Sequence, residues 1–274
     1  MQFVLDTSVS TEVLWQEFVH EYAIIPVLVH RHHLSASTIQ RRFHAYEVPP
    51  VIHEPCTMVA VMDATKVHTS WILAVRDPHK KKTIYAEEIS SETTFQYQIA
   101  HERLTARGYT FSAIVSDGRF VAVKWLFPGI PIQMCHYHQI QIIIGYLTFN
   151  PKLKAGIELL HLVRTLPRND EASFTDAFKL WCRTYHDFLQ EKTLNTETGR
   201  SHWTHKRLRQ ARDSIAAHLE FLFTFQRYPE LTIPNTTNSL DGSFKKAKVA
   251  IAVHSGLTLK QQIKLVLSVL FSHQ

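Results

Sequence analysis

The sequence predicts an α/β protein in which helices cover a mixed β-sheet, and its pattern of short apolar runs leads to this prediction. These runs are rich in β-branched residues and have the length of strands; they lie at 56–62, 71–76, 83–89, 111–116 and 130–134. A helical pattern at 94–107 stops before Gly108, and a further helix is predicted between the fourth and fifth strands. Three strands joined by hairpins, followed by helix, strand, helix and strand, favour a mixed sheet covered by helices.

The helical segments on either side of the strands divide the chain into three regions. Residues 1–50 are predicted to be a helical segment that ends at a Glu-Val-Pro-Pro linker. The sheet and its helices would comprise residues 51–139 and 231–274, with a last helix at 257–271 packed on the sheet. Residues 140–230 contain no convincing strand and are predicted to be an all-helical insertion, with a loop at 192–202.

Composition restricts the class of protein. The chain has 274 residues, an apolar content of 45%, a net charge of +6 and a pI of about 9.2, which suits a nucleic-acid-binding protein. Three cysteines do not make a disulfide framework, so a reducing compartment is expected. No run of 18 apolar residues is present and the N-terminus lacks a signal-peptide pattern. We therefore expect a cytoplasmic protein, not embedded in a membrane, with access to DNA.

The segment 27–43 has the layout of a helix-turn-helix, whose second helix enters the major groove of DNA. Ser35 or Ser37 can cap the second helix, and Ile39 and Phe43 share one of its faces. The residues that would contact DNA project from its other faces: Gln40, Arg41 and Arg42. The alternative is a small surface bundle with exposed arginines. We favour DNA binding because the rest of the chain also indicates a DNA substrate.

Three aspartates are candidates for a metal site. Asp63 and Asp117 each end a predicted buried strand, and Asp241 is predicted on a distant helix, with Asn238 on the same side one turn earlier. A carboxylate at the end of a buried strand is costly unless its charge is stabilised, and Mg²⁺ prefers such oxygen ligands. If the three converge, they could hold divalent metal for phosphodiester chemistry. For each aspartate alone, the alternative is an ordinary turn residue.

A second motif, Cys135-x-x-His138, follows the fifth predicted strand. Cysteine and histidine at this spacing can form half of a zinc site, but the sequence offers no C-x-x-C to complete it. We favour a thiol and an imidazole beside the acidic site, where they would orient a phosphate or a metal-bound water. The remaining alternative is a buried cysteine next to a surface histidine.

In their order along the chain, these motifs resemble the landmarks of DDE/D transposases with an RNase H-like core. The landmarks are the strand ending in Asp63, the Val-Ser-Asp117-Gly sequence, the Cys135-x-x-His138 pair and the Asn-Ser-Leu-Asp241-Gly sequence. They are most similar to the IS256 and Mutator-like group of bacterial insertion sequences, in which a helical domain precedes the last acid. The resemblance extends over roughly residues 30 to 272.

The resemblance implies a role for each matching residue. Asp63, Asp117 and Asp241 would be the catalytic ligands of Mg²⁺ or Mn²⁺, with Cys135 and His138 as the pair near the site. The third acid is Glu in most of the family and Asp in this chain. Trp203, in the insertion, would stack on a base at the transposon end, a contact worth roughly 1–3 kcal/mol. The alternative for Trp203 is a place in the helical core.

Basic clusters accompany these motifs and would contact DNA phosphates without reading sequence. One cluster follows Asp241 on its helix and the other begins an insertion helix; the predicted contact residues are Lys245, Lys248, Lys206 and Arg207. A solvated basic face is the alternative for each cluster. For Lys80, Lys81 and Lys82, in the hairpin between the second and third strands, we prefer that alternative.

The function predicted from these observations is DNA transposition. A metal-dependent transposase would cleave transposon ends and transfer the freed 3′ end into target DNA. Its expected partner is double-stranded DNA, on which it would form a homo-oligomer, and its expected location is the nucleoid. Two alternatives stay open: a metal-dependent nuclease without strand transfer, and an inactive remnant that only binds DNA.

Overall fold

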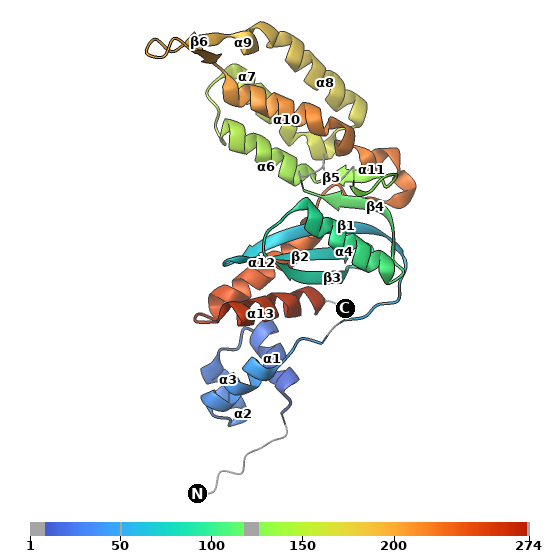
Figure 1. The fold of residues 1–274 in the computed structure, drawn as a ribbon, viewed down its shortest axis with the longest axis vertical. Helices are drawn as coiled ribbons and strands as arrows, with labels where there is room; N and C mark the ends of the chain where they lie inside the picture. Colours follow the sequence, from blue (N-terminus) through green and yellow to red (C-terminus); the bar gives the residue numbers. More distant parts are fainter. Residues whose placement is uncertain (1–8, 50, 118–125, 273–274) are drawn as a thin grey trace, which may run out of the picture. The chain divides into compact units, whose positions relative to one another are not determined.

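The computed structural model describes residues 9–49, 51–117 and 126–272, and these residues form an α/β fold with a five-stranded mixed sheet (Figure 1). Its strands are ordered β3-β2-β1-β4-β5, where β2 and β3 pair antiparallel and β4 and β5 pair parallel. The strand bounds are β1 Thr57–Val67, β2 Ser70–Asp77, β3 Lys82–Ile89, β4 Thr110–Ser116 and β5 Ile132–Met134. All five predicted strands are thus present. The helix predicted between β4 and β5 falls mostly on residues 118–125, outside the described residues.

Strand β1 is longer than predicted, so Asp63 lies inside the strand rather than at its end. Only two residues, including His68 with φ 53°, separate β1 from β2. Such a tight connection keeps two neighbouring strands paired up to the turn, and β1 therefore continues to Val67. Residues 58–63 are all buried, whereas Lys66 is exposed between two buried neighbours. The burial pattern of the strand changes at Asp63 from continuously buried residues to alternating buried and exposed ones. The sequence therefore suggested that the strand ends at this residue.

The chain divides into two compact units, and β1 contributes residues to both. Unit 1 comprises the described parts of Met1–Cys56, Met62–Thr110 and Asn238–Gln274. Unit 2 comprises Thr57–Val61 and the described parts of Phe111–Thr237.

Unit 1 begins with three helices, α1 Thr11–His20, α2 Ile25–His32 and α3 Ala36–Ala45. Ser35 caps α3 by accepting a hydrogen bond from Thr38 N at 3.1 Å, and Ile39 and Phe43 are buried, as the sequence predicted. Helix α1 buries Leu14 and Phe18, whereas Val13 is 46% exposed.

Three polar side chains attach these helices to the C-terminal helices α12 Asn238–Val253 and α13 Leu259–Phe271. Trp15 Nε1 donates to Ser268 Oγ at 2.7 Å, and His254 Nε2 donates to the Phe18 carbonyl at 2.7 Å. The Lys264 ammonium is buried and donates to the carbonyls that end α3, those of Phe43, His44 and Tyr46. Burial lowers the pKa of Lys264, but these carbonyls replace the water that its charge has lost.

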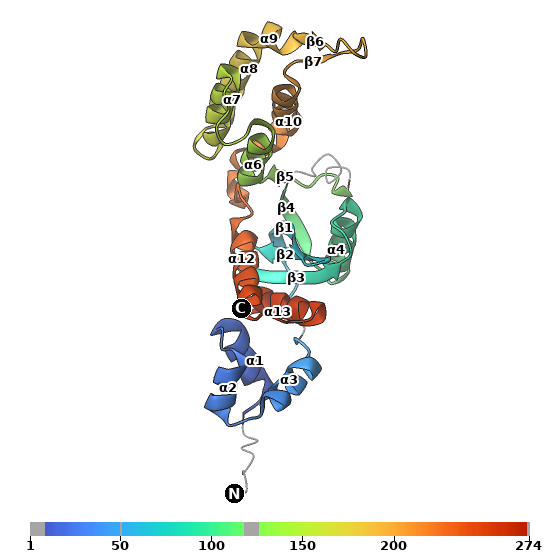
Figure 2. The ribbon, with the colours of Figure 1, turned by 90° about the vertical axis from the view of Figure 1, so that its left-hand side faces the viewer.

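Helix α4, Thr94–Ala106, and helix α12 lie on opposite sides of the sheet strands of unit 1 (Figure 2). Helix α4 packs on β2 and β3 and ends before Gly108, whose φ of 89° suits glycine. Helix α13 packs on β3, so the predicted packing of the last helix on the sheet is confirmed. A capping box formed by Thr258 and Gln261 begins α13.

Unit 2 is mostly helical, but the prediction of an all-helical insertion was wrong in one place. The segment predicted as a loop forms a short hairpin of β6 Lys192–Leu194 and β7 Ser201–Trp203. Asn195 supports its turn by accepting from the backbone N–H groups at 197 and 198, and Gly199 adopts φ 63°. Three-residue strands carry too little alternation to be read from sequence. The helices of this unit are α6 His136–Leu147, α7 Lys154–Arg164, α8 Glu171–Thr184, α9 His186–Gln190, α10 Lys206–Leu222 and α11 Thr224–Arg227.

A buried polar network joins the C-terminal end of α10 to β5. The Leu222 carbonyl accepts hydrogen bonds from Gln133 Nε2 at 2.9 Å and from His136 Nε2 at 2.5 Å. The His136 ring is fully buried against Phe223 and Phe225. Desolvation lowers the pKa of His136, so its neutral form is the one that the fold accommodates.

Acid should destabilise the fold through its buried histidines. Burial lowers the pKa of His136, His218 and His254, so the unfolded chain binds protons more readily than the folded one. Their stabilisation is complete above about pH 6.5, the pKa of an unperturbed histidine, and is lost as pH falls through their lowered pKa values in the folded state.

We expect the melting temperature to fall between pH 7.5 and pH 5.5, and His136→Gln, which retains a donor for Leu222, to reduce the fall. Thermal unfolding followed by circular dichroism checks this, with the exposed His161→Gln as the control. If the melting temperatures of His136→Gln and His161→Gln fell equally between pH 7.5 and pH 5.5, the role given to His136 would be contradicted.

Candidate metal centre

Asp63 is the most buried carboxylate of the predicted site. Its side chain is 4% exposed, and Oδ1 accepts a hydrogen bond from Ala64 N at 2.8 Å. The flanking strand residues Met62 and Val61 are fully buried and hold this position in the sheet. An ionised carboxylate at such a position needs strong compensating interactions.

Asp241 lies close to Asp63, although the two are far apart in the sequence. A carboxylate oxygen of each residue lies within 4.8 Å of the other. Asp241 is in the first turn of α12, which Leu240 and Phe244 anchor by burying their side chains in unit 1. The fold therefore brings together two of the three predicted ligands.

A third acid of unit 1, Glu92, also lies close to Asp63 and was missed in the sequence. One of its oxygens lies within 4.8 Å of an oxygen of Asp63. Glu92 follows β3 and precedes Thr93, the N-cap of α4, and it accepts a hydrogen bond from the Tyr97 hydroxyl at 2.8 Å. In sequence it reads as an ordinary acid at a helix start. Its position between a strand and a helix was the only signal available.

These acids fit a hard divalent cation. Two carboxylates about 5 Å apart repel each other by about 3 kcal/mol at an effective dielectric constant near 20. Oxygens that ligate one Mg²⁺ lie about 3–4 Å apart, because each Mg–O bond is about 2.1 Å long. Each pair with Asp63 lies within 4.8 Å, which is compatible with this value. An all-oxygen donor set suits Mg²⁺ or Mn²⁺ better than a softer metal.

Asp117 belongs to unit 2 and is the first residue after β4, as the sequence predicted. The carbonyl of Ser116, at the end of β4, accepts a hydrogen bond from Cys135 N at 2.9 Å. This bond continues the parallel pairing of β4 with β5 to the last residue of both strands. Asp117 and the Cys135 motif thus follow adjacent strands at the same edge of the sheet.

Cys135 and His138 form a hydrogen-bonded cluster with Thr237 in unit 2. The buried Cys135 Sγ accepts from Thr237 N at 3.3 Å and from its hydroxyl at 3.5 Å, and that hydroxyl lies 3.5 Å from His138 Nδ1. Burial raises the pKa of the Cys135 thiol, but hydrogen bonds from His138 and Thr237 outweigh it, so the pKa is lowered. Within the described residues no group of three possible metal ligands includes Cys135, so the structure adds no support for zinc.

The remaining predicted residues of α12 lie near Asp241 on the same helix. Asn238 is the first residue of α12 and is exposed one turn before Asp241. Lys245 and Lys248 are exposed one and two turns after it. The three residues and Asp241 therefore follow one face of α12, with positive charge beyond the acid.

The predicted DNA-contact residues of α3 differ in their surroundings. Gln40 and Arg41 are exposed. Arg42 is half-buried and donates from Nη1 to the Val9 carbonyl at 3.0 Å, so it attaches the segment before α1 to the helix. Gln40 and Arg41 can reach a ligand without breaking such a bond.

Trp203 lies outside the helical core, and its indole ring is already in contact with other side chains. It lies half-buried on β7, with the Arg209 guanidinium 3.8 Å and the Lys192 ammonium 4.7 Å from its ring centroid. Lys206 is exposed at the start of α10, and Arg207 donates to the Gly145 carbonyl at 2.6 Å. The cationic groups of Arg209 and Lys192 therefore lie against the Trp203 ring.

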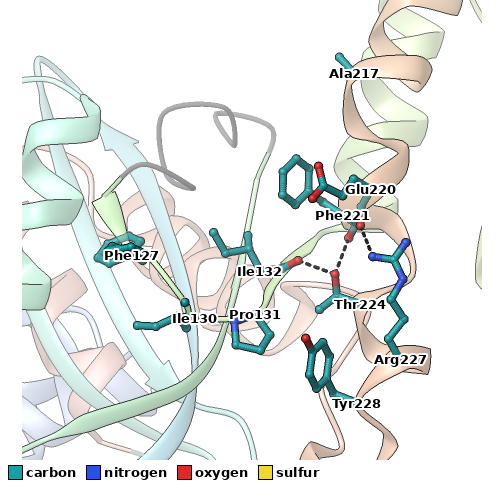
Figure 3. A pocket seen from close by; sticks show the side chains of 12 residues that line it. Phe127, Ile130, Pro131, Ile132, Ala217, Glu220, Phe221, Thr224, Arg227 and Tyr228 are labelled. Atoms are coloured by element: carbon teal, nitrogen blue, oxygen red, sulfur yellow. Dashed lines mark hydrogen bonds between the residues drawn. The ribbon is translucent and has the colours of Figure 1, made fainter.

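A cavity of about 660 Å³ in unit 2 lies apart from these groups (Figure 3). Its walls are mainly apolar and include Phe127, Ile130 and Phe221. Two of its polar residues are engaged with the protein: Thr224 Oγ1 donates to the Ile132 carbonyl at 2.6 Å, and Arg227 pairs with Glu171. None of the predicted site residues lines this cavity.

No family model and no curated protein matches the chain. Of the helices in the described residues, none has both the length and the apolar character needed to cross a membrane.

Proposed function

We propose that this protein is a DNA transposase of the DDE/D class with an RNase H-like core. The observation that carries the proposal is the proximity of Asp63 and Asp241, whose oxygens lie within 4.8 Å although they come from a central strand and a C-terminal helix. The ordered motifs that resemble this class, and the five-stranded mixed sheet, support it further.

In this proposal three aspartates hold two divalent cations, Mg²⁺ or Mn²⁺. Asp63 and Asp241 would supply ligands from unit 1, and Asp117 is the third ligand that the resemblance implies. Bound ions of this kind neutralise phosphate charge and activate the attacking oxygen. The burial of Asp63 keeps its carboxylate in one orientation, while the Cys135–His138 cluster orients the phosphodiester.

DNA would be bound by three basic surfaces. We assign α3 to the recognition helix of a helix-turn-helix, with Gln40 and Arg41 on base edges and Arg42 holding the segment before α1. Lys245 and Lys248 would contact phosphates beside the acids, and Lys206 and Arg207 would do so on the insertion. Trp203 would stack on a base, supported by Arg209. Transposase of this class would act as a homo-oligomer on DNA, in the nucleoid.

The test uses purified protein and a plasmid carrying the DNA that flanks its own gene, with Mg²⁺ or with EDTA. We expect Mg²⁺-dependent cleavage in the flanking DNA and joining of the freed 3′ ends to a second plasmid, both lost with EDTA. Sequencing of the junctions identifies the cleaved ends.

Two other outcomes would contradict the proposal and identify its rivals. Cleavage without joining, even with a precut end, would indicate a nuclease. Binding without cleavage, together with no Mn²⁺ binding, would indicate an inactive DNA-binding remnant.

A further inference from the structure

A second cavity of unit 2, of about 390 Å³, has a cationic lining. It lies where the loop between α6 and α7 meets the start of α10. Lys152, Lys206 and Arg207 line its walls, and no aspartate or glutamate does so among the residues that the structure describes. A cavity whose charged walls are all of one sign attracts the opposite charge, so this one is suited to an anion.

The cationic groups of this cavity are available to a ligand. In the described part of the chain neither Lys152 nor Lys206 pairs with an acid, and both side chains are exposed. Arg207 donates from Nη2 to the Gly145 carbonyl at 2.6 Å, which holds its guanidinium in place and leaves other N–H groups to donate. His205 is instead engaged, because its Nε2 lies 2.9 Å from a carboxylate oxygen of Glu191.

Two helices begin at the cavity and add partial positive charge to it. The N-cap residues Leu153 of α7 and His205 of α10 make no side-chain cap bond, so they leave the first N–H groups of both helices without a capping acceptor. Gly156 and Leu208, from these two first turns, both line the cavity. The start of a helix favours a phosphate group, and here it adds to the charge of the three cations.

Much of the remaining lining is apolar and includes an aromatic ring. Tyr146 belongs to the last turn of α6, and Leu147, Pro151 and Leu153 extend the same wall along the chain. An aromatic ring beside aliphatic side chains suits a nucleobase, which is bound by stacking and by burial of its faces. The volume also falls within the roughly 300–1,000 Å³ of small-molecule sites.

We propose that this cavity binds a nucleoside phosphate, with the phosphate at Lys152, Lys206 and Arg207 and the base against Tyr146. The ligand is either a free nucleotide or the terminal nucleotide of a DNA strand, since both present the same phosphate and base. Lys206 and Arg207, which were assigned above to DNA phosphates, bind a phosphate in either case. Binding at this cavity does not require the metal centre, so its failure would leave the proposed function intact.

Isothermal titration calorimetry of the full chain with AMP, in EDTA to exclude binding through a metal, tests the proposal. We expect AMP to bind, and adenosine and inorganic phosphate each to bind at least about tenfold more weakly, since each lacks part of the contacts. Lys152→Gln and Lys206→Gln should each weaken AMP binding by about tenfold, because a charge-assisted hydrogen bond is lost. Tyr146→Leu should weaken the binding of AMP but not of inorganic phosphate. The control is Lys179→Gln on α8, which removes the same charge from an exposed residue outside the lining.

Competition for bound AMP identifies the source of the nucleotide. Displacement by a 5′-phosphorylated single-stranded oligonucleotide, but not by its unphosphorylated form, would assign the cavity to a strand end. Failure of both to displace AMP would assign it to a free nucleotide. The proposal is overturned if the unaltered chain binds no AMP, or if the Lys152→Gln and Lys206→Gln proteins, folded by circular dichroism, bind AMP as tightly as the unaltered chain does.

Discussion

Replacing Asp63 with asparagine is expected to lower the rate of the metal-dependent DNA cleavage proposed above by more than about 100-fold, because mutation of even the partners of metal ligands changes activity by about 10–100-fold. Asp63 is the shared neighbour of Asp241 and Glu92, so its loss affects every carboxylate pair identified in unit 1. Asparagine keeps the size of the side chain but removes its charge. The folded protein without metal should be at least as stable as before, since two like-charge repulsions disappear.

Two measurements on the same preparation check this expectation. Cleavage of end-containing DNA with Mg²⁺ reports the chemistry, and a binding assay with EDTA reports DNA affinity, which should change little. Asp176→Asn removes an exposed acid from α8 and provides the control. Asp63→Asn protein that cleaves within tenfold of the unaltered rate would exclude Asp63 as a metal ligand.

Trp15→Ala should be the most destabilising single change in the N-terminal helices, at about 3–5 kcal/mol. Trp15 is 1% exposed, lies 5.1 Å from Phe43 and 5.6 Å from Phe18 between ring centroids, and donates to Ser268 on α13. The substitution leaves a cavity between α1 and α13 and leaves the Ser268 hydroxyl without this donor. Both effects weaken the attachment of α1–α3 to the rest of unit 1.

Urea unfolding followed by circular dichroism measures the change in the free energy of unfolding, and limited proteolysis reports release of α1–α3. The matched control is Val13→Ala on the same helix, which removes a side chain that is 46% exposed and should cost less than about 0.5 kcal/mol. A loss below about 1 kcal/mol for Trp15→Ala would mean that α1 is not held through this ring.

Local patterns predicted the elements of the fold well, since they depend on spacing along the chain. Buried β-branched runs identified β1 and β4, and Ser35 followed by Ile39 and Phe43 identified α3. The same patterns misplaced Asp63 at a strand end, because pairing with β2 extends β1 beyond the buried run. They also missed the β6–β7 hairpin, whose strands are only three residues long.

The candidate site could be predicted only in part. A strand end, a C-x-x-H spacing and a helix with an acid are local features, and these indicated Asp117, His138 and Asp241. Glu92 was missed because its closeness to Asp63 is set by how α4 packs on the sheet, which no local pattern encodes. The hydrogen bond from Arg42 to the Val9 carbonyl could not be predicted either, because the two residues lie 33 positions apart.

The buried Lys264 has a consequence for the distance between a recognised DNA sequence and the position of a cut. Its ammonium fastens the last turn of α3 to α13, and His254 fastens α1 beside the end of α12, the helix that carries Asp241. These bonds connect α3 with the helix that carries Asp241 inside unit 1. If α3 binds DNA and Asp241 takes part in the proposed cleavage, the cuts should fall at a constant number of base pairs from the recognised sequence, whatever the intervening bases.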